Sequence, residues 1–174
     1  GVGVVVLKRL SDARRDGDNI QAIIKGIGAS SDGAGNAIYA PSSNGQSRAL
    51  REAYRQAGVQ PRTIELVEAH GTGTRVGDQV EANSLSAVFS EDAGDGHGDG
   101  EGSAADAYRS WCALGSVKSM IGHTKAAAGV AGLIKTVLAL QHKVLPATLK
   151  IGKPLESLTP GRTPIYLNTR TRPW

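Results

Sequence analysis

The sequence predicts an α/β fold in which helices cover a sheet of parallel strands. Its 174 residues are enough for one domain or a large part of one. From residue 47 onward, helical and strand-like segments alternate in the order α, β, α, β, α, which is typical of parallel strands joined by right-handed crossovers. Aromatic residues make up only 4% of the chain. The core must therefore consist of aliphatic side chains, as in parallel sheets that are covered on both faces.

The first thirty residues are expected to form a pair of strands. Residues 2–7 and 21–30 are apolar and strand-like, and a polar link with two Asp/Gly turn signals separates them. Because this link is too polar to indicate a helix, we predict an antiparallel pair. Gly, Ser, Asn and Pro then dominate residues 30–46, which indicates a loop.

The remaining elements follow from apolar periodicity and from helix start and stop signals. An apolar stripe predicts a helix over 47–58 that ends at Gly58. Asp78 and Glu81 have the D-x-x-E spacing of a capping box at the start of a predicted helix 78–89. The other expected elements are strands 63–69 and 110–119, helix 124–142, an extended piece 143–150 and an edge strand 164–169.

Residues 90–109 form a low-complexity stretch that we interpret as a flexible surface insertion. Five glycines alternate through residues 94–102, and nothing apolar there is large enough to pack. Calcium binding is an alternative, with Asp95, Asp99 and Glu101 as oxygen ligands. The stretch lacks both the EF-hand ligand order and repeated glycine-rich nonapeptides, so the insertion is the preferred interpretation.

Two histidines occupy equivalent places at the ends of predicted strands. His70 directly follows strand 63–69, and His123 follows strand 110–119 after a short bend. The carboxyl ends of parallel strands lie on one edge of a sheet, where open α/β folds bind their ligands. We therefore expect both imidazoles at the same edge.

The residues around this histidine pair favour stabilisation of negative charge. Lys118 adds a cation, Thr72 and Thr74 add hydroxyl donors, and the helix that starts at residue 124 adds free N–H groups. This set suits a developing oxyanion or enolate, whereas glycoside hydrolysis requires paired carboxylic acids. The alternative is that each histidine is only a structural hydrogen-bonding residue.

The other histidines and the single cysteine are weaker candidates. His97 lies in the insertion, and His142 is expected at a helix end. Cys112 opens a buried strand with no adjacent histidine or helix start, which argues against a nucleophile. A zinc site would need a third ligand at the histidine edge, so no metal is predicted.

Composition limits the environment and the partners. One cysteine excludes an internal disulfide and favours the cytoplasm. No signal peptide or membrane span is predicted. Residues 91–106 contain six of the sixteen acidic residues, so the rest of the chain carries 20 basic against 10 acidic groups and suits an acidic partner. No pattern indicates nucleic-acid binding.

Two motifs with long flanking similarity identify a family resemblance. VEAHGTGTRVGD (67–78) and GSVKSMIGHTKAAAGVAGLIK (115–135) resemble the β-ketoacyl synthases of type I polyketide synthases and polyunsaturated fatty acid synthases. The stretches GVVVLKRLSDARRDGD, YAPSSNGQSRALREAY and HKVLPATL extend the resemblance over nearly the whole chain outside 90–109.

The resemblance implies a fold and a reaction. The fold is a partial thiolase-like layered sandwich, with 1–30 as a strand pair from its first half and 47–169 as the α/β unit of its second half. The reaction is decarboxylative Claisen condensation of malonyl groups that an acyl carrier protein delivers on phosphopantetheine. His70 and His123 would assist decarboxylation, Lys118 would tune His123, and Thr72 and Thr74 would bind the pantetheine arm. No cofactor is expected on the chain itself, and the complete domain is expected to be a homodimer.

One departure from the family pattern concerns the nucleophile. The family's acyl-carrying cysteine lies in a D-T-A-C-S-S-like stretch that this sequence lacks, as it lacks the G-F-G-G-T-N loop. We therefore expect the chain to be inactive alone and marginally stable without the rest of the ketosynthase domain. The alternatives are a non-catalytic scaffold or carrier-protein-docking piece, and a degradative thiolase, which the paired HGTGT and GHT loops argue against.

Overall fold

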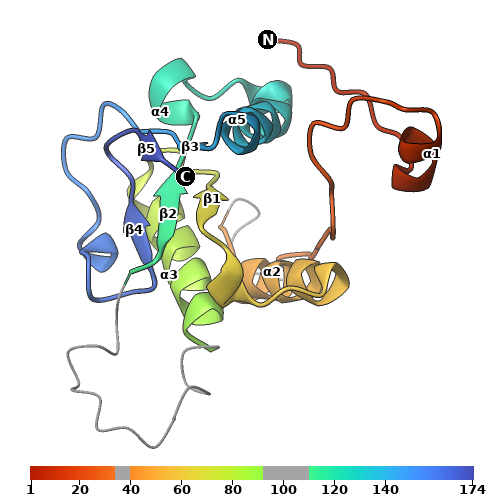
Figure 1. Ribbon diagram of the computed structural model, residues 1–174. Helices are drawn as coiled ribbons and strands as arrows, with labels where there is room; N and C mark the ends of the chain where they lie inside the picture. Colours follow the sequence, from red (N-terminus) through yellow and green to blue (C-terminus); the bar gives the residue numbers. More distant parts are fainter. Residues whose placement is uncertain (34–39, 92–109) are drawn as a thin grey trace, which may run out of the picture.

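A parallel sheet lies at the centre of the molecule. The computed structural model describes residues 1–33, 40–91 and 110–174 (Figure 1). The three parallel strands lie in the order β1-β2-β4. They are β1 (Leu66–Glu68), β2 (Cys112–Gly115) and β4 (Ile165–Leu167). A separate antiparallel ribbon pairs β3 (Val144–Leu145) with β5 (Arg172–Pro173).

Helices lie on both faces of this sheet (Figure 1). The five α-helices of the described residues are α1 (Leu10–Arg15), α2 (Ser43–Ala57), α3 (Arg75–Glu91), α4 (Lys118–Ile121) and α5 (Ala128–His142). Short 3₁₀ turns occur at Pro61–Thr63, Lys125–Ala127 and Glu156–Leu158. None of these helices is both long and apolar enough to cross a membrane.

The alternation of side chains along β2 assigns the two faces. Successive residues of a strand point to opposite faces. Cys112 and Leu114 belong to the apolar core on the α3 side. A side chain at Gly115 would meet Lys135 of α5 on the other side. The main core lies between α3 and the sheet and consists of Ala82, Leu85, Val88, Phe89, Cys112, Leu114, Leu158 and Ile165.

Helix α2 supports α3 from outside this core. Tyr54 of α2 meets Phe89 of α3 edge to face, with ring centroids 6.0 Å apart. Arg51 of α2 also forms an ion pair with Glu91 at the end of α3. The helix starts at residue 43, earlier than the predicted residue 47, because the Ser42 side chain accepts a hydrogen bond from the Gly45 N–H. It ends at Gly58, as predicted, where a left-handed φ of 62° closes the last turn.

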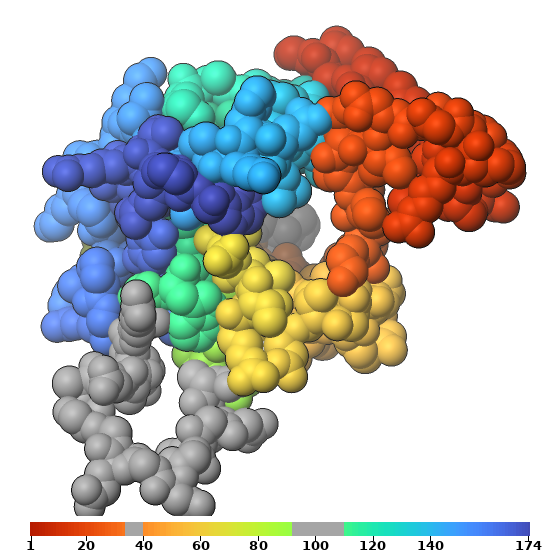
Figure 2. Space-filling model, viewed as in Figure 1, coloured from red at the N-terminus to blue at the C-terminus, as the bar shows by residue number. Residues whose placement is uncertain are grey.

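The predicted strand pair over 1–30 is wrong. Residues 2–7 and 21–30 are extended but form no strand, and the polar link contains helix α1. A strand needs a hydrogen-bonded partner, and the described residues provide none for either segment. Val2 and Val6 are each 94% exposed, so the apolar pattern that predicted buried strands has no sheet to pack against. The segment forms an arm at the edge of the molecule (Figure 2).

The later predictions agree in type and order with the structure, but the strands are shorter. The predicted strand 110–119 ends at Gly115, and Lys118 lies instead at the start of α4. The predicted edge strand 164–169 corresponds to β4, an edge strand of the parallel sheet. From residue 92 on, the predicted insertion 90–109 lies outside the described residues.

Helix α5 contacts the end of β1 through a glycine, which gives a test of the packing. A Cβ at Gly132 would lie 3.1 Å from Cγ of Glu68, whereas a Cβ at Gly129 in the same helix would meet nothing within 4 Å. Gly129→Ala should stabilise the chain by up to about 1 kcal/mol through helix propensity. Gly132→Ala should instead destabilise it by about 1–3 kcal/mol through overpacking. Urea unfolding measures both, and an equal gain in the two variants would contradict this packing.

Candidate active site

The two histidine side chains lie next to each other at the carboxyl edge of the parallel sheet. The ring centroids of His70 and His123 are 5.3 Å apart, with an interplanar angle of 85°. His70 lies two residues after β1, and His123 follows β2 by way of the short helix α4. The juxtaposition predicted from strand order is therefore present, and both residues are exposed to solvent.

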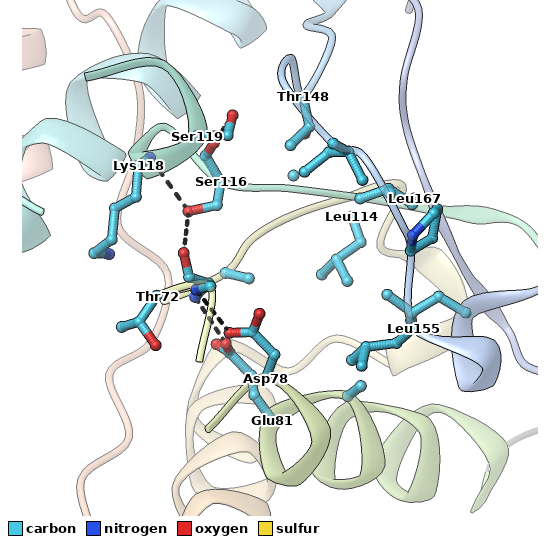
Figure 3. A pocket seen from close by; sticks show the side chains of 18 of the residues that line it. Thr72, Asp78, Glu81, Leu114, Ser116, Lys118, Ser119, Thr148, Leu155 and Leu167 are labelled. Carbon is cyan, nitrogen blue, oxygen red and sulfur yellow. Dashed lines mark hydrogen bonds between the residues drawn. The ribbon is translucent and has the colours of Figure 1, made fainter. Parts of the chain in front are cut away.

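Two carboxylates of α3 hold the loop that carries His70. The carboxylate of Glu81 accepts hydrogen bonds from the backbone N–H of His70 at 2.7 Å and from that of Gly71 at 2.9 Å. The Asp78 carboxylate accepts from the Gly73 N–H at 3.1 Å (Figure 3). The predicted capping box for Asp78 and Glu81 is thus wrong. The helix starts at residue 75, so both carboxylates lie inside its first two turns and face the histidine loop.

Glycine is required at the first turn of this loop. Gly71 has a φ of 45°, which is strained for residues with a side chain. A Cβ there would also lie 2.7 Å from Cβ of Ser116. The close approach holds the His70 loop against the start of the segment that carries Lys118 and His123.

The hydrogen bonding of His123 selects one neutral tautomer. Its Nδ1 accepts a hydrogen bond from the Lys125 backbone N–H at 3.1 Å. Since Nδ1 is an acceptor, the proton lies on Nε2, which becomes a donor. Desolvation lowers the pKa of His123 below its ordinary value, and the charges of Lys118, His70 and Lys125 lower it further. The ring is therefore neutral at pH 7 and can donate a hydrogen bond without first losing a proton.

Lys118 enters the site from the first residue of α4. The helix has only four residues and ends at Gly122, whose φ of 76° redirects the chain toward His123. Figure 3 shows Lys118 on the same side of the cavity as Thr72, with Thr148, Leu155 and Leu167 across from them. The hydroxyls of Thr72 and Thr74 lie 3.0 Å apart and share a hydrogen bond.

A cavity of about 530 Å³ is lined by His123 but not by His70. Its rim includes the three lysines 118, 150 and 153, its far wall includes leucines 114, 155, 158 and 167, and the carboxylates of Asp78 and Glu81 line it as well. Thr148 lines this cavity, and its hydroxyl is buried without a hydrogen-bond partner in the described residues. Sequence reasoning missed Thr148, because a threonine in an extended segment gives no signal of its surroundings.

Cys112 and His142, which we excluded from the sequence, do not line this cavity. Cys112 is fully buried, and desolvation raises the pKa of its thiol to about 12, which excludes a thiolate nucleophile at neutral pH. His142 is the last residue of α5, as predicted. His97 lies outside the described residues. No cluster of three His, Cys, Asp or Glu side chains that could hold a metal occurs in residues 1–33, 40–91 and 110–174.

Comparison with known proteins gives one consistent result. Residues 21–152 match the family described as "Beta-ketoacyl synthase, C-terminal domain". The chain is 46% identical over its whole length to one of the polyunsaturated fatty acid synthase polypeptides of Thraustochytrium sp., of which it covers 6%. It is 45% identical over its whole length to polyketide synthase GfsA from Streptomyces halstedii, of which it covers 2%.

Solved structures agree with this match. The ketosynthase from module 6 of the bacillaene synthase of Bacillus subtilis 168 superposes with a TM-score of 0.82 at 44% sequence identity. The alignment covers 96% of this chain and 28% of that one. The likeness confirms the predicted α/β fold class, a partial thiolase-like sandwich. The chain spans only a small part of the length of each of these relatives.

Replacing Glu81 tests its hold on the histidine loop. In Glu81→Gln only one oxygen remains as an acceptor, and the new NH₂ group faces a backbone N–H. Loss of a charge-assisted hydrogen bond costs about 1.5–3 kcal/mol. Amide exchange at His70 and Gly71 should therefore accelerate roughly 10- to 100-fold. Glu156→Gln, at an exposed surface pair with Arg162, is the control and should leave both amides unchanged. Equal effects of the two variants would contradict the assigned contact.

The pH titration of His123 tests its electrostatic surroundings. Removing the Lys118 ammonium in Lys118→Met should raise the pKa of His123 part of the way toward its ordinary value, because desolvation and the charges of His70 and Lys125 remain. Lys150→Met removes another lysine of the cavity rim that does not act on His123, and should not change the titration. Histidine ring NMR signals followed against pH give the measurement. A His123 pKa that does not move in Lys118→Met would disprove the coupling.

Proposed function

The chain belongs to the family of β-ketoacyl synthase C-terminal domains, whose members are condensing enzymes, and from this premise we propose that it supplies the two histidines of a decarboxylative Claisen condensation. The observation that carries the proposal is the 5.3 Å separation of the His70 and His123 rings, with His123 and Lys118 both lining the cavity. Donors and cations converge there, which favours chemistry that forms an anionic oxygen.

The proposed first step is decarboxylation of a malonyl thioester. The bond between the α-carbon and the carboxylate breaks, carbon dioxide leaves, and the electron pair passes into an enolate. The Nε2–H of His123 donates a hydrogen bond to the thioester oxygen as negative charge develops there. His70, whose ring centroid lies 5.3 Å from that of His123, would donate to the same oxygen from the neighbouring loop. Because the neutral His123 ring is held by Lys125, this donor is in place before the charge forms.

The second step forms the new carbon–carbon bond. The enolate carbon attacks the carbonyl of an acyl group carried as a thioester on a cysteine, and that cysteine leaves as a thiolate. Cys112 cannot serve, since it is buried in the core between β2 and α3 and its pKa is raised. We propose that the acyl-carrying cysteine belongs to another segment of a complete ketosynthase domain and that this chain is inactive alone.

The malonyl group is proposed to arrive on the phosphopantetheine arm of an acyl carrier protein. Thr72 and Thr74 at the loop and the buried hydroxyl of Thr148, which has no partner in the described residues, offer hydrogen bonds to the amides of such an arm. Lys150 and Lys153 at the cavity rim suit its phosphate or the acidic surface of a carrier protein. A homodimeric complete domain and a cytoplasmic location stay predictions.

Complementation tests this proposal. The chain is co-expressed with the amino-terminal portion of the bacillaene synthase module 6 ketosynthase, which is to supply the cysteine, and condensation of malonyl and acyl thioesters is followed by mass spectrometry. We expect activity that His123→Ala lowers by roughly 10²- to 10³-fold, the usual cost of losing one oxyanion donor. His142→Ala, at the far end of α5, is the matched control and should keep the activity. Carrier-protein binding without any condensation would instead favour a scaffold role.

A further inference from the structure

A buried ion pair connects helix α5 to the last residue of β1. Nζ of Lys135 lies 2.6 Å from Oε2 of Glu68, and the two side chains are only 10% and 11% exposed. The other ion pairs among the described residues lie on the surface, with each side chain at least 34% exposed. A pair that has been removed from water must be held in good geometry to be tolerated, which indicates a specific role for this one.

Two glycines make room for the pair. A Cβ at Gly132 of α5 would lie 3.1 Å from Cγ of Glu68. A Cβ at Gly115 of β2 would lie 3.3 Å from Nζ of Lys135 and 2.8 Å from Oγ1 of Thr148. The space for both charged groups is therefore built into the helix on one side and the strand on the other.

The second carboxylate oxygen of Glu68 holds the segment that carries Lys118. Oε1 accepts a hydrogen bond from the Val117 backbone N–H at 2.5 Å. Val117 is the residue just before α4, and its N–H has no partner within that helix. One carboxylate thus fixes the start of α4, and the chain reaches His70 two residues after Glu68, beyond the end of β1. Neither Glu68 nor Lys135 lines the cavity at the histidines.

We infer that Glu68 is a positioning residue that holds the turn from Lys118 to His123 in register with His70, and that Lys135 is the counter-ion that holds the Glu68 side chain in place. A buried charged group needs a partner, and a hydrogen bond to a charged acceptor is stronger than one to a neutral acceptor. The inference rests on the proposed function for its effect on condensation. The position of the turn itself can be measured without activity, by the titration of His123.

Three variants separate the hydrogen bond from the ion pair. Glu68→Gln with Lys135→Met removes both charges but keeps an oxygen that can accept from Val117. Glu68→Met with Lys135→Met removes both charges and that oxygen. Val117→Pro removes the donor instead, and the φ of −61° at Val117 already suits proline. The readout is the titration of His123, which is faced by Lys118 from α4, His70 from the loop after β1, and Lys125 from the turn before α5.

We expect the pKa of His123 to divide the variants into two groups. In the 174-residue chain, the Gln/Met double variant should keep the lowered pKa of His123. The Met/Met double variant and Val117→Pro should both raise that pKa toward the ordinary histidine value, because α4 then no longer holds Lys118 near the ring. Equal titrations in all three variants would overturn the inference. Unfolding of only the Met/Met and Val117→Pro variants, measured by circular dichroism, would also overturn it. The hydrogen bond between Val117 and Glu68 would then be needed for folding and not for positioning the turn.

The complemented enzyme distinguishes this inference from the proposed function. Where condensation is restored, the Met/Met variant should lower kcat more than it raises KM, because the turn acts on the transition state and not on substrate binding. Where no condensation is obtained, the proposed function fails, and the split in the His123 titrations still decides the positioning role.

Discussion

The parallel pairing of β1 with β2 is the constraint on which the site depends. The register places Leu66 opposite Ala113 and Glu68 opposite Gly115, so both strands end at the same level. β1 then leads into the loop with His70, and β2 leads through the short helix α4 to His123, so the two imidazoles meet at this edge. An antiparallel arrangement would have placed the same two loops at opposite edges of the sheet. The chemistry of the site is therefore a consequence of strand direction.

The carboxylates and the lysines around the site have different roles. The carboxylates of Glu68, Asp78 and Glu81 lie close to the histidines, yet each accepts hydrogen bonds from backbone N–H groups behind them. Asp78 and Glu81 also line the cavity, but the hydrogen bonds that they accept order the His70 loop. Three lysines line the same cavity, and the His123 ring remains an uncharged donor. This arrangement suits an anionic intermediate, because the carboxylates accept from backbone N–H groups and not from the His123 ring.

The parallel sheet and the histidine edge could be predicted from the sequence because both follow from local order. Apolar periodicity marks α2, α3 and α5, and the position of His70 and His123 just after strand-like runs is visible in the chain itself. The first thirty residues were predicted wrongly because a strand depends on a partner, which periodicity cannot reveal. Asp78 and Glu81 were misassigned because the spacing of a capping box is the same whether a carboxylate faces its own helix or a neighbouring loop. The partners of Glu68 are 49 and 67 residues away in the sequence, which no local pattern reports.

The two glycines beside the buried ion pair have a consequence for how this protein can diverge. A larger residue at Gly132 would contact Glu68, whereas one at Gly115 would contact Thr148 first and then Lys135. A larger residue at either glycine therefore requires a simultaneous change in the side chains that it would contact. A related protein with smaller neutral residues in place of Glu68 and Lys135 could carry alanine in place of Gly132. That alanine would then disfavour a return of the charged pair.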